Sequence, residues 1–197
     1  MKRSTLAALF VLTSGIAFGN VFEDKAKEFC DKGEAEVCTD LGNYYREGNS
    51  KYQIEKDATK AVEMLTKGCD LSSAAGCNVL GYMHGNGLGV KKDLAKAAEL
   101  YQKACDGREA TGCFNLGVMY DNGQGVKKNV IKAVELYQKA CTGGDDTGCF
   151  NLGMKYYKGD GVRKNNAEAL KSFSKACNMK VQDACDAYAN LKSGKLK

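Results

Sequence analysis

The sequence predicts an all-α fold, a solenoid of αα-hairpin repeats that carries one disulfide in each repeat. Five cysteine pairs recur along the 197 residues, and the two members of every pair are eight positions apart. The sequence around the pairs repeats with a period of 36 residues, after a first interval of 39. Repetition at this period is typical of solenoids, in which each repeat buries its apolar face only against its neighbours. The pairs are Cys30/Cys38, Cys69/Cys77, Cys105/Cys113, Cys141/Cys149 and Cys177/Cys185.

Each repeat contains two predicted helices, which we call helix A and helix B. Helix A begins near the second cysteine of a pair and places apolar residues at the spacing of one helical face. It ends in the glycine-containing stretch 121–125, where glycine can take the left-handed conformation that closes a helix. Helix B follows Asn129, which we expect to be its N-cap. The expected core positions are Cys113, Leu116, Gly117 and Tyr120 in helix A and Ala133, Leu136, Tyr137 and Ala140 in helix B.

One small residue recurs inside helix A although it lowers helix propensity. It is Gly42, Gly81, Gly117 or Gly153 in the successive repeats. We expect each of these glycines to allow a close approach of helices A and B.

The cysteine spacing requires a chain reversal between the two members of each pair. Eight residues of continuous α-helix advance about 12 Å, whereas the Cα atoms of a disulfide lie less than about 7 Å apart. Each disulfide therefore joins the end of one helix B to the start of the next helix A, and Gly107, Gly143 and Gly144 lie where the reversal is needed. Structural zinc sites usually have cysteines two to four residues apart with further ligands nearby. The wider spacing and the single histidine favour disulfides, and we expect no metal and no cofactor.

The two ends of the chain differ from the repeats between them. Residues 1–19 have a short basic head, a brief apolar run and small residues before Gly19, and they predict a signal peptide cleaved after Gly19. Residues 20–193 form the predicted solenoid, with four helix pairs and one capping helix at each end, and 194–197 form a polar tail. A three-residue insertion in the first repeat, around 50–53, is expected to lengthen a loop.

The predicted export and the charge limit the partners. Removing Lys2 and Arg3 lowers the formal charge from +5 to +3, far below the charge of a nucleic-acid-binding protein. No later segment is apolar enough to span a membrane. We expect an exported monomer, periplasmic or extracellular, that binds no nucleic acid.

The repeat also resembles a known family. The pattern Leu-Gly-x-x-Tyr, then Gly-x-Gly-Val, then Lys-Ala-x-x-x-Tyr-x-x-Ala is similar to Sel-like repeats, which are relatives of tetratricopeptide repeats. The cysteine pair in every repeat resembles the Helicobacter cysteine-rich protein family. The resemblance implies a right-handed superhelix of αα-hairpins that is exported and disulfide-bonded. It also implies one of two functions. Family members are either secreted factors that engage host or envelope components, or penicillin-binding proteins with weak β-lactamase activity.

The predicted ligand surface is a concave groove lined by helix A. Counting from the second cysteine of each pair, positions +3, +4 and +7 are assigned to the core and the more apolar positions +1 and +5 to packing between repeats. Positions +2, +6 and +9 remain as the groove, for a peptide, a protein or a cell-wall fragment, because asparagine amides can hold an extended backbone. The predicted groove residues are Tyr44, Met83, Asn115, Met119, Asn122, Asn151, Lys155 and Lys158.

The alternative function is an enzyme that hydrolyses β-lactams, but no catalytic residue is assigned. Serine β-lactamases have a serine three residues before a lysine, with further Ser-Asp-Asn and Lys-Thr-Gly motifs. The chain has Ser172 and Lys175 at this spacing, but no Ser-Asp-Asn. Ser172 aligns with Met64, Leu100 and Leu136, so we interpret it as a weakened core position.

Two further features are assigned to the scaffold. His84 occupies the position held by tyrosine in the other repeats, and we interpret it as a packing substitution. Basic pairs recur in the loops between helices A and B and predict a basic ridge that could attract anionic polymers. They are Lys91-Lys92, Lys127-Lys128 and Arg163-Lys164.

Overall fold

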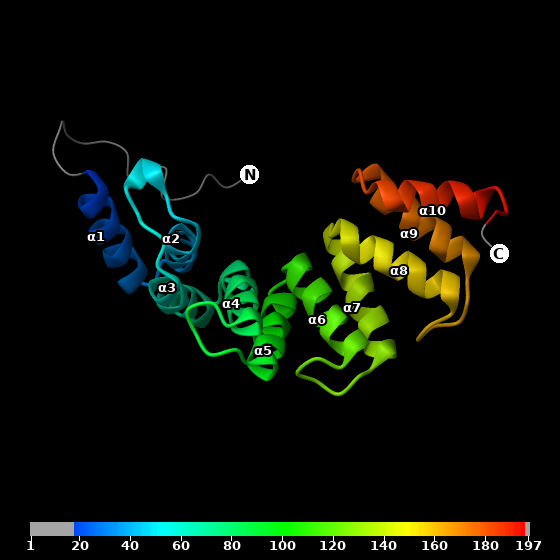
Figure 1. The fold of residues 1–197 in the computed structure, drawn as a ribbon, viewed down its shortest axis with the longest axis horizontal. Coiled ribbons are helices and arrows are strands. Elements are labelled where there is room, and N and C mark those ends of the chain that lie inside the picture. The colour runs from blue at the N-terminus through cyan, green and yellow to red at the C-terminus, as the bar shows by residue number, and fades with distance from the viewer. Residues whose placement is uncertain (1–17, 196–197) are drawn as a thin grey trace. The chain divides into compact units, whose positions relative to one another are not determined.

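A computed structural model of the protein describes residues 18–195, and these residues form ten α-helices and one short 3-10 helix without a β-strand (Figure 1). They comprise four helix pairs with one extra helix at either end. The pairs are α2/α3, α4/α5, α6/α7 and α8/α9, flanked by α1 and α10. The bounds are α1 Phe18–Asp31, α2 Ala35–Glu47, α3 Ala58–Asp70, α4 Ala74–Asn86, α5 Leu94–Asp106, α6 Ala110–Asn122, α7 Val130–Gly143, α8 Asp146–Lys158, α9 Asn166–Asn178 and α10 Gln182–Lys192.

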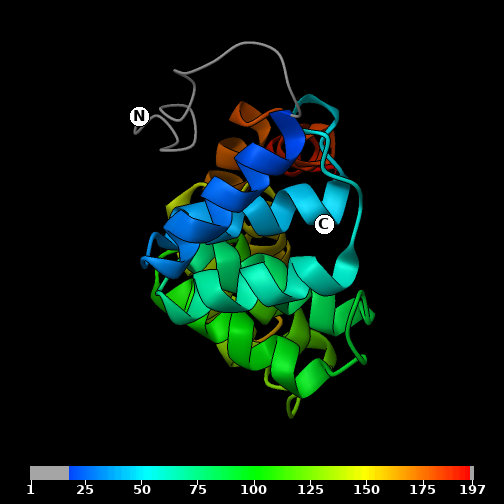
Figure 2. The ribbon, with the colours of Figure 1, turned by 90° about the vertical axis from the view of Figure 1, so that its left-hand side faces the viewer.

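The chain forms two compact units. The N-terminal unit extends to Gly107 and contains α1–α5, and the C-terminal unit begins at Arg108 and contains α6–α10. Within each unit every helix packs against the next one in the chain. Figure 2 shows α1, α2 and α3 of the N-terminal unit stacked in this order. Helix A also contacts helix A of the adjacent repeat, as α6 contacts α8.

The helix ends follow the signals in the sequence. Asn129 caps α7, because its side chain accepts a hydrogen bond from the backbone N–H of Lys132, as predicted. Asp57, Asp93 and Asn165 cap α3, α5 and α9 in the same way. At the other end, α6 stops at Asn122, and Gly123 follows with a φ of 72°. That left-handed conformation is one that glycine adopts without steric cost.

The glycines inside helix A let helices A and B touch, as predicted. A Cβ atom at Gly117 would lie 2.8 Å from the ring of Tyr137, and one at Gly153 would lie 2.5 Å from the ring of Phe173. Both distances are shorter than any normal contact between carbon atoms. These positions therefore exclude every side chain, and the aromatic rings of helix B pack directly on the backbone of helix A.

The disulfides join helix B of one repeat to helix A of the next, as predicted. Four pairs have Cα atoms 4.3–4.8 Å apart, close to the usual range for a disulfide. Cys105 and Cys113 are disulfide-bonded as well, so no cysteine within residues 18–195 is free. The four pairs with measured distances are Cys30–Cys38, Cys69–Cys77, Cys141–Cys149 and Cys177–Cys185.

Helix A begins near the second cysteine of each pair, as predicted, and that cysteine is the fourth residue of the helix. Two of these helices have a side-chain N-cap, because Ser73 accepts a hydrogen bond from the backbone N–H of Gly76 in α4 and Asp145 accepts one from Gly148 in α8. The second cysteines lie near the start of each helix A and face the packed interior. They therefore do not contribute to a surface that could bind a ligand. Cys38, Cys77, Cys113 and Cys149 are buried, and Cys185 in the last helix is half-buried.

The predicted glycines do not all take the left-handed conformation in the chain reversals inside the disulfides. Gly144 has a φ of 95°, in the left-handed region, as a reversal requires. Gly107 lies in the reversal between α5 and α6, as predicted, but its φ is −75° and the next residue, Arg108, takes the left-handed conformation. A Cβ atom at Gly107 would instead lie 2.6 Å from the Cβ atom of Ala74, so the close approach of α4 accounts for this glycine.

The three-residue insertion lengthens the loop between α2 and α3, as predicted, and this longer loop is structured. It contains a 3-10 helix at Ser50–Tyr52, closed by mutual backbone hydrogen bonds between Asn49 and Ile54. The ring of Tyr52 stacks on Phe22 of α1, with 3.8 Å between ring centroids, and lies 5.5 Å from the ring of Tyr44. The insertion therefore holds the N-terminal capping helix on the first repeat. Most of the predicted signal peptide, residues 1–17, lies outside the described residues, as do residues 196–197 of the predicted tail.

Candidate binding surface on the helix A faces

The structure corrects the assignment of position +6 to the ligand groove. Met83 and Met119 are 0% and 5% exposed, and Lys155 is 9% exposed, so these three predicted groove residues are buried. Tyr44, the residue at +6 in the first repeat, is half-buried against the ring of Tyr52. The apolar residues at +1 and +5 do pack against the core, since Phe114, Val118, Phe150 and Met154 are half-buried against it.

The remaining predicted residues keep some access to solvent. Asn115 and Asn151 at +2 are half-buried, and Asn122 and Lys158 at +9 are exposed. Position +5 joins this surface, since Tyr82 is 47% exposed and Val118 and Met154 are half-buried. In the C-terminal unit we call this surface the α6–α8 face. It consists of Asn115, Val118, Asn122, Asn151, Met154 and Lys158.

A charged cluster lies beneath the α6–α8 face. The ammonium of Lys155 on α8 donates to a carboxylate oxygen of Asp121 on α6 at 2.7 Å and to one of Asp160 at 2.6 Å. Burial alone would lower the pKa of Lys155, but its hydrogen bonds to the two carboxylates outweigh burial and raise that pKa. The hydrogen bond from Lys155 holds the pKa of Asp160 below its ordinary value. Lys155 therefore carries its charge at neutral pH and ties two adjacent repeats together.

Tyr137 of α7 extends this cluster to Asn151. Its hydroxyl lies 3.5 Å from a carboxylate oxygen of Asp121 and also hydrogen-bonds the side chain of Asn151. Burial, followed by the charge of Asp121, raises the pKa of Tyr137 above its ordinary range, so the hydroxyl stays protonated. One amide of the α6–α8 face is thus fixed in orientation by a buried residue.

The residues of this cluster could have been recognised in the sequence as positions that differ between repeats, but the shared repeat pattern does not reveal such positions. Lysine stands at position +6 only in the fourth repeat, where the second and third repeats have methionine. Asp121 stands at a position held by Arg46, Gly85 and Tyr157 in the other repeats. A buried lysine at a position where other repeats have methionine needs a counter-charge. Asp121, an acidic residue found only in the preceding repeat at its position, supplies that charge.

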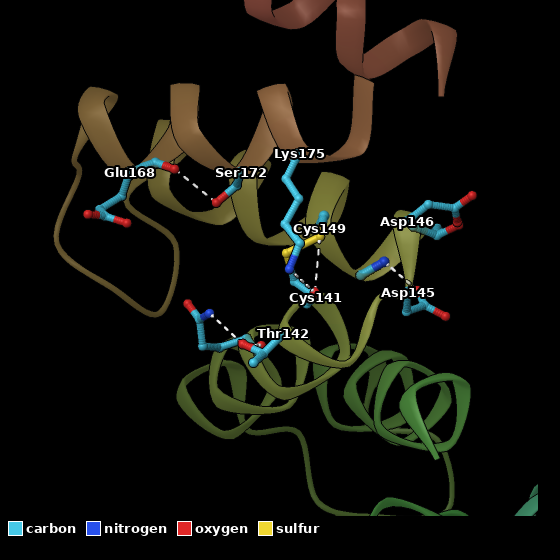
Figure 3. The surroundings of a disulfide bond; sticks show 11 residues. Cys141, Thr142, Asp145, Asp146, Cys149, Glu168, Ser172 and Lys175 are labelled. Atoms are coloured by element: carbon cyan, nitrogen blue, oxygen red, sulfur yellow. Dashed lines mark hydrogen bonds between the residues drawn. A yellow bond between two sulfur atoms is a disulfide. The ribbon is translucent and has the colours of Figure 1, made fainter. Parts of the chain in front are cut away.

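Ser172 and Lys175 do not form a nucleophile and base pair (Figure 3). Ser172 is 5% exposed, and its hydroxyl donates to the backbone carbonyl of Glu168, one helical turn earlier. The ammonium of Lys175 donates to the backbone carbonyl of Cys141 at 2.6 Å. Each group is therefore used within the fold, and the interpretation of Ser172 as a core position is confirmed.

His84 is a packing residue near the end of α4. Its Nδ1 atom is buried and has no hydrogen-bond partner. Burial lowers the pKa of His84, and this effect outweighs the attraction of Asp93. The imidazole is therefore neutral at physiological pH.

The described part of the chain holds neither a metal-binding cluster nor a membrane-spanning helix. Residues 18–195 contain no group of three or more His, Cys, Asp and Glu side chains placed to hold a metal ion. Over the same range no helix combines the length and the apolar character that crossing a membrane requires.

Comparison with known proteins shows that the chain matches a protein family. The Sel1 repeat pattern matches residues 35–73, 74–108, 110–145 and 147–181. No curated protein sequence matches the chain.

Three solved structures illustrate the range of similar proteins. The c5321 protective antigen of uropathogenic Escherichia coli is 31% identical with a TM-score of 0.81, and the match covers 88% of this chain but only 37% of the antigen. Helicobacter pylori cysteine rich protein B is 38% identical with a TM-score of 0.55, over 71% of this chain and 98% of that protein. A Sel1 repeat protein from Oxalobacter formigenes, 23% identical with a TM-score of 0.75 over 87% of this chain and 67% of that one, shares the fold.

Proposed function

Because this chain belongs to the Sel1-repeat family, we propose that it is an exported, disulfide-bonded scaffold that binds an extended peptide segment of a partner protein on its α6–α8 face. The single observation that carries the proposal is the cluster that the buried Lys155 forms with Asp121 and Asp160 beneath that face. Buried ion pairs are weak contributors to stability, since their desolvation offsets much of their attraction. A role in ligand binding explains why a scaffold has such a cluster, because the cluster holds polar groups in the orientation that a ligand needs.

The chemistry of the α6–α8 face suits a peptide backbone. An asparagine amide both donates and accepts, as a peptide group does, and the exposed Asn122 lies on this face with the half-buried Asn115 and Asn151. Val118 and Met154 place apolar surface between these amides, and methionine adapts readily to different side chains. Lys158, exposed at the end of α8, favours an acidic residue in the ligand.

The disulfides support the proposed export. Disulfides persist in oxidising compartments and are rare where thiols are kept reduced. Together with the predicted signal peptide they favour the periplasm or the exterior of the cell. Cell fractionation tests this location, followed by mass spectrometry of the purified protein under non-reducing conditions. Retention in the cytoplasm with every cysteine reduced would contradict it.

Selection from a phage library of random peptides tests the binding function. Peptides selected on the wild-type protein are expected to bind the double variant Asn122→Ala/Lys158→Ala at least about tenfold more weakly, which corresponds to about 1.4 kcal/mol. Both residues are exposed, so the variant keeps the fold. The matched control is Gln138→Ala/Lys139→Ala, which removes an amide and an ammonium from the exposed surface of α7. Equal binding by the variant and the control would rule out the α6–α8 face.

A further inference from the structure

We propose that the loops between helices A and B of the C-terminal unit form a second binding surface, which holds a linear polymer bearing repeated phosphate or sulfate groups. This surface, the basic edge, consists of Lys127 and Lys128 in the α6–α7 loop and Arg163 and Lys164 in the α8–α9 loop. It is distinct from the α6–α8 face and does not depend on the peptide-binding proposal. In Figure 1 the two loops lie at the lower side of the C-terminal unit.

The α8–α9 loop of the basic edge contacts the first residue of α7, which directly follows the α6–α7 loop. Gly161 in the α8–α9 loop has a φ of 73°, and a Cβ atom there would lie 2.8 Å from the carbonyl oxygen of Val130, the first residue of α7. The loop therefore rests on the start of the preceding helix B, two residues after Lys128. The same arrangement holds in the N-terminal unit, where Gly89 rests on the backbone of Ala58. The contact places the two basic pairs in a row along one edge.

Direct ion pairs do not neutralise the charges of the basic edge in the described part of the chain. All four side chains are exposed, and none forms an ion pair among residues 18–195. Lys164 lies over the ring of Tyr157, 5.4 Å from its centroid, which leaves its ammonium accessible. The acidic residue of the α8–α9 loop, Asp160, is paired with Lys155, and its carboxylate also interacts electrostatically with Lys128. The surface thus presents four positive charges without a free carboxylate in the two loops.

The helix caps beside the basic edge add to its positive potential. In the N-terminal unit the loops end in the acidic caps Asp57 and Asp93, whose charge opposes the positive end of the helix dipole. In the C-terminal unit the corresponding caps are the neutral residues Asn129 and Asn165. The start of α7 therefore keeps its partial positive charge, whereas α9 has the carboxylate of Glu168 in its first turn. Arg163, Lys164, Asn165 and Asn166 also line a pocket of about 620 Å³.

The partner is a polymer rather than a single small anion, because the charges are exposed and follow one another from repeat to repeat. Exposed lysine and arginine side chains bind a polyanion mainly by releasing its counterions, so the affinity falls steeply with salt. A lipid surface is less suited, since the only large apolar side chain that is exposed in the described part of the C-terminal unit is Ile131.

Salt-dependent binding to heparin and to polyphosphate tests the proposal. With four contacts, wild-type affinity is expected to fall about 50-fold between about 50 and 200 mM salt, by analogy with flexible single-stranded polyanions. The variant with Lys127, Lys128, Arg163 and Lys164 all changed to Gln is expected to lose most of this binding and its salt dependence. Binding to only one of the two polymers would assign the ligand to sulfate or to phosphate chemistry.

The control variant has the same net charge but leaves the basic edge intact. It carries Lys139→Gln, Lys171→Gln, Lys180→Gln and Lys195→Gln, four exposed lysines elsewhere in the C-terminal unit. Equal loss of binding in the two variants would show that only net charge matters and would overturn the proposal. It would also be overturned if the wild-type protein bound neither polymer, whether or not it bound anionic phosphatidylglycerol vesicles. Circular dichroism of both variants confirms that they are folded.

Discussion

Replacing Asp121 by Asn tests how the buried ammonium of Lys155 is held. The side chain of Lys155 is 11% exposed, that of Asp121 is 23% exposed and that of Asp160 is 51% exposed. Removing one partner of a fully buried ion pair costs about 3–5 kcal/mol. Because Asp160 remains and Asp121 is partly exposed, we expect the free energy of unfolding to fall by about 1.5–2.5 kcal/mol, near the value of one hydrogen bond to a charged group.

Two further variants distinguish the loss of the partner of Lys155 from a general effect of removing a negative charge. Asp160→Asn is expected to cost less than about 1 kcal/mol, because that carboxylate is half-exposed and screened by water. The double variant Asp121→Ala/Lys155→Met removes the buried charge together with its partner and restores the methionine found at Met83 and Met119. It should be close to the wild-type protein in stability.

Urea unfolding followed by circular dichroism measures these differences. A shift of about 2–4 °C in Tm for each kcal/mol is the parallel thermal readout for a chain of this size. The reasoning would be refuted if Asp160→Asn cost more than Asp121→Asn, or if the double variant were as unstable as the single one. Either result would mean that the position of Asp121 matters for a reason other than the charge of Lys155.

Three other predictions concern the scaffold. Cys141→Ser/Cys149→Ser opens a loop of about nine residues and should lower the free energy of unfolding by about 2.5 kcal/mol in urea titrations, the loop-entropy value; no loss would contradict that origin. Burial lowers the pKa of His84 in the folded state, so the unfolded state binds the proton more readily and stability should fall as the pH drops below about 6.5, the unfolded value. His84→Phe should flatten this slope between about pH 7.5 and 5.5, and an unchanged slope would assign it to other groups. Gly153→Ala should cost about 1–3 kcal/mol, because the added carbon overlaps the adjacent aromatic ring, and a neutral effect would show that the ring can shift.

The sequence alone predicted the architecture well because every part of it is local and repeated. The cysteine spacing required a reversal at each disulfide, and Gly117 and Gly153 indicated where two helices touch. These signals involve residues within one repeat and its immediate neighbour, and each appears several times. Their agreement from repeat to repeat is what made the prediction of the fold secure.

The surface was predicted less well because it depends on how adjacent repeats meet. The periodicity of helix A identifies a core direction but does not determine which flank the next repeat covers. It therefore places Met83 and Met119 in a groove although they are buried. Two non-repeating residues, Asp121 and Asp160, hold the buried lysine. Repeat averaging hides such residues, and they are found only by looking for positions where one repeat departs from the others.

The positions of the disulfides determine what a protease can release from this protein. Arg108 and Lys180 lie inside turns that are spanned by a disulfide, so the two sides of a cut there stay covalently joined. Lys127 and Lys128 lie in a loop that no disulfide spans, and they are exposed to trypsin. A single cut in that loop separates the chain into two fragments even without a reducing agent. The fragments would end between helices A and B of one repeat, so digestion of this protein would break its repeats internally rather than between neighbours.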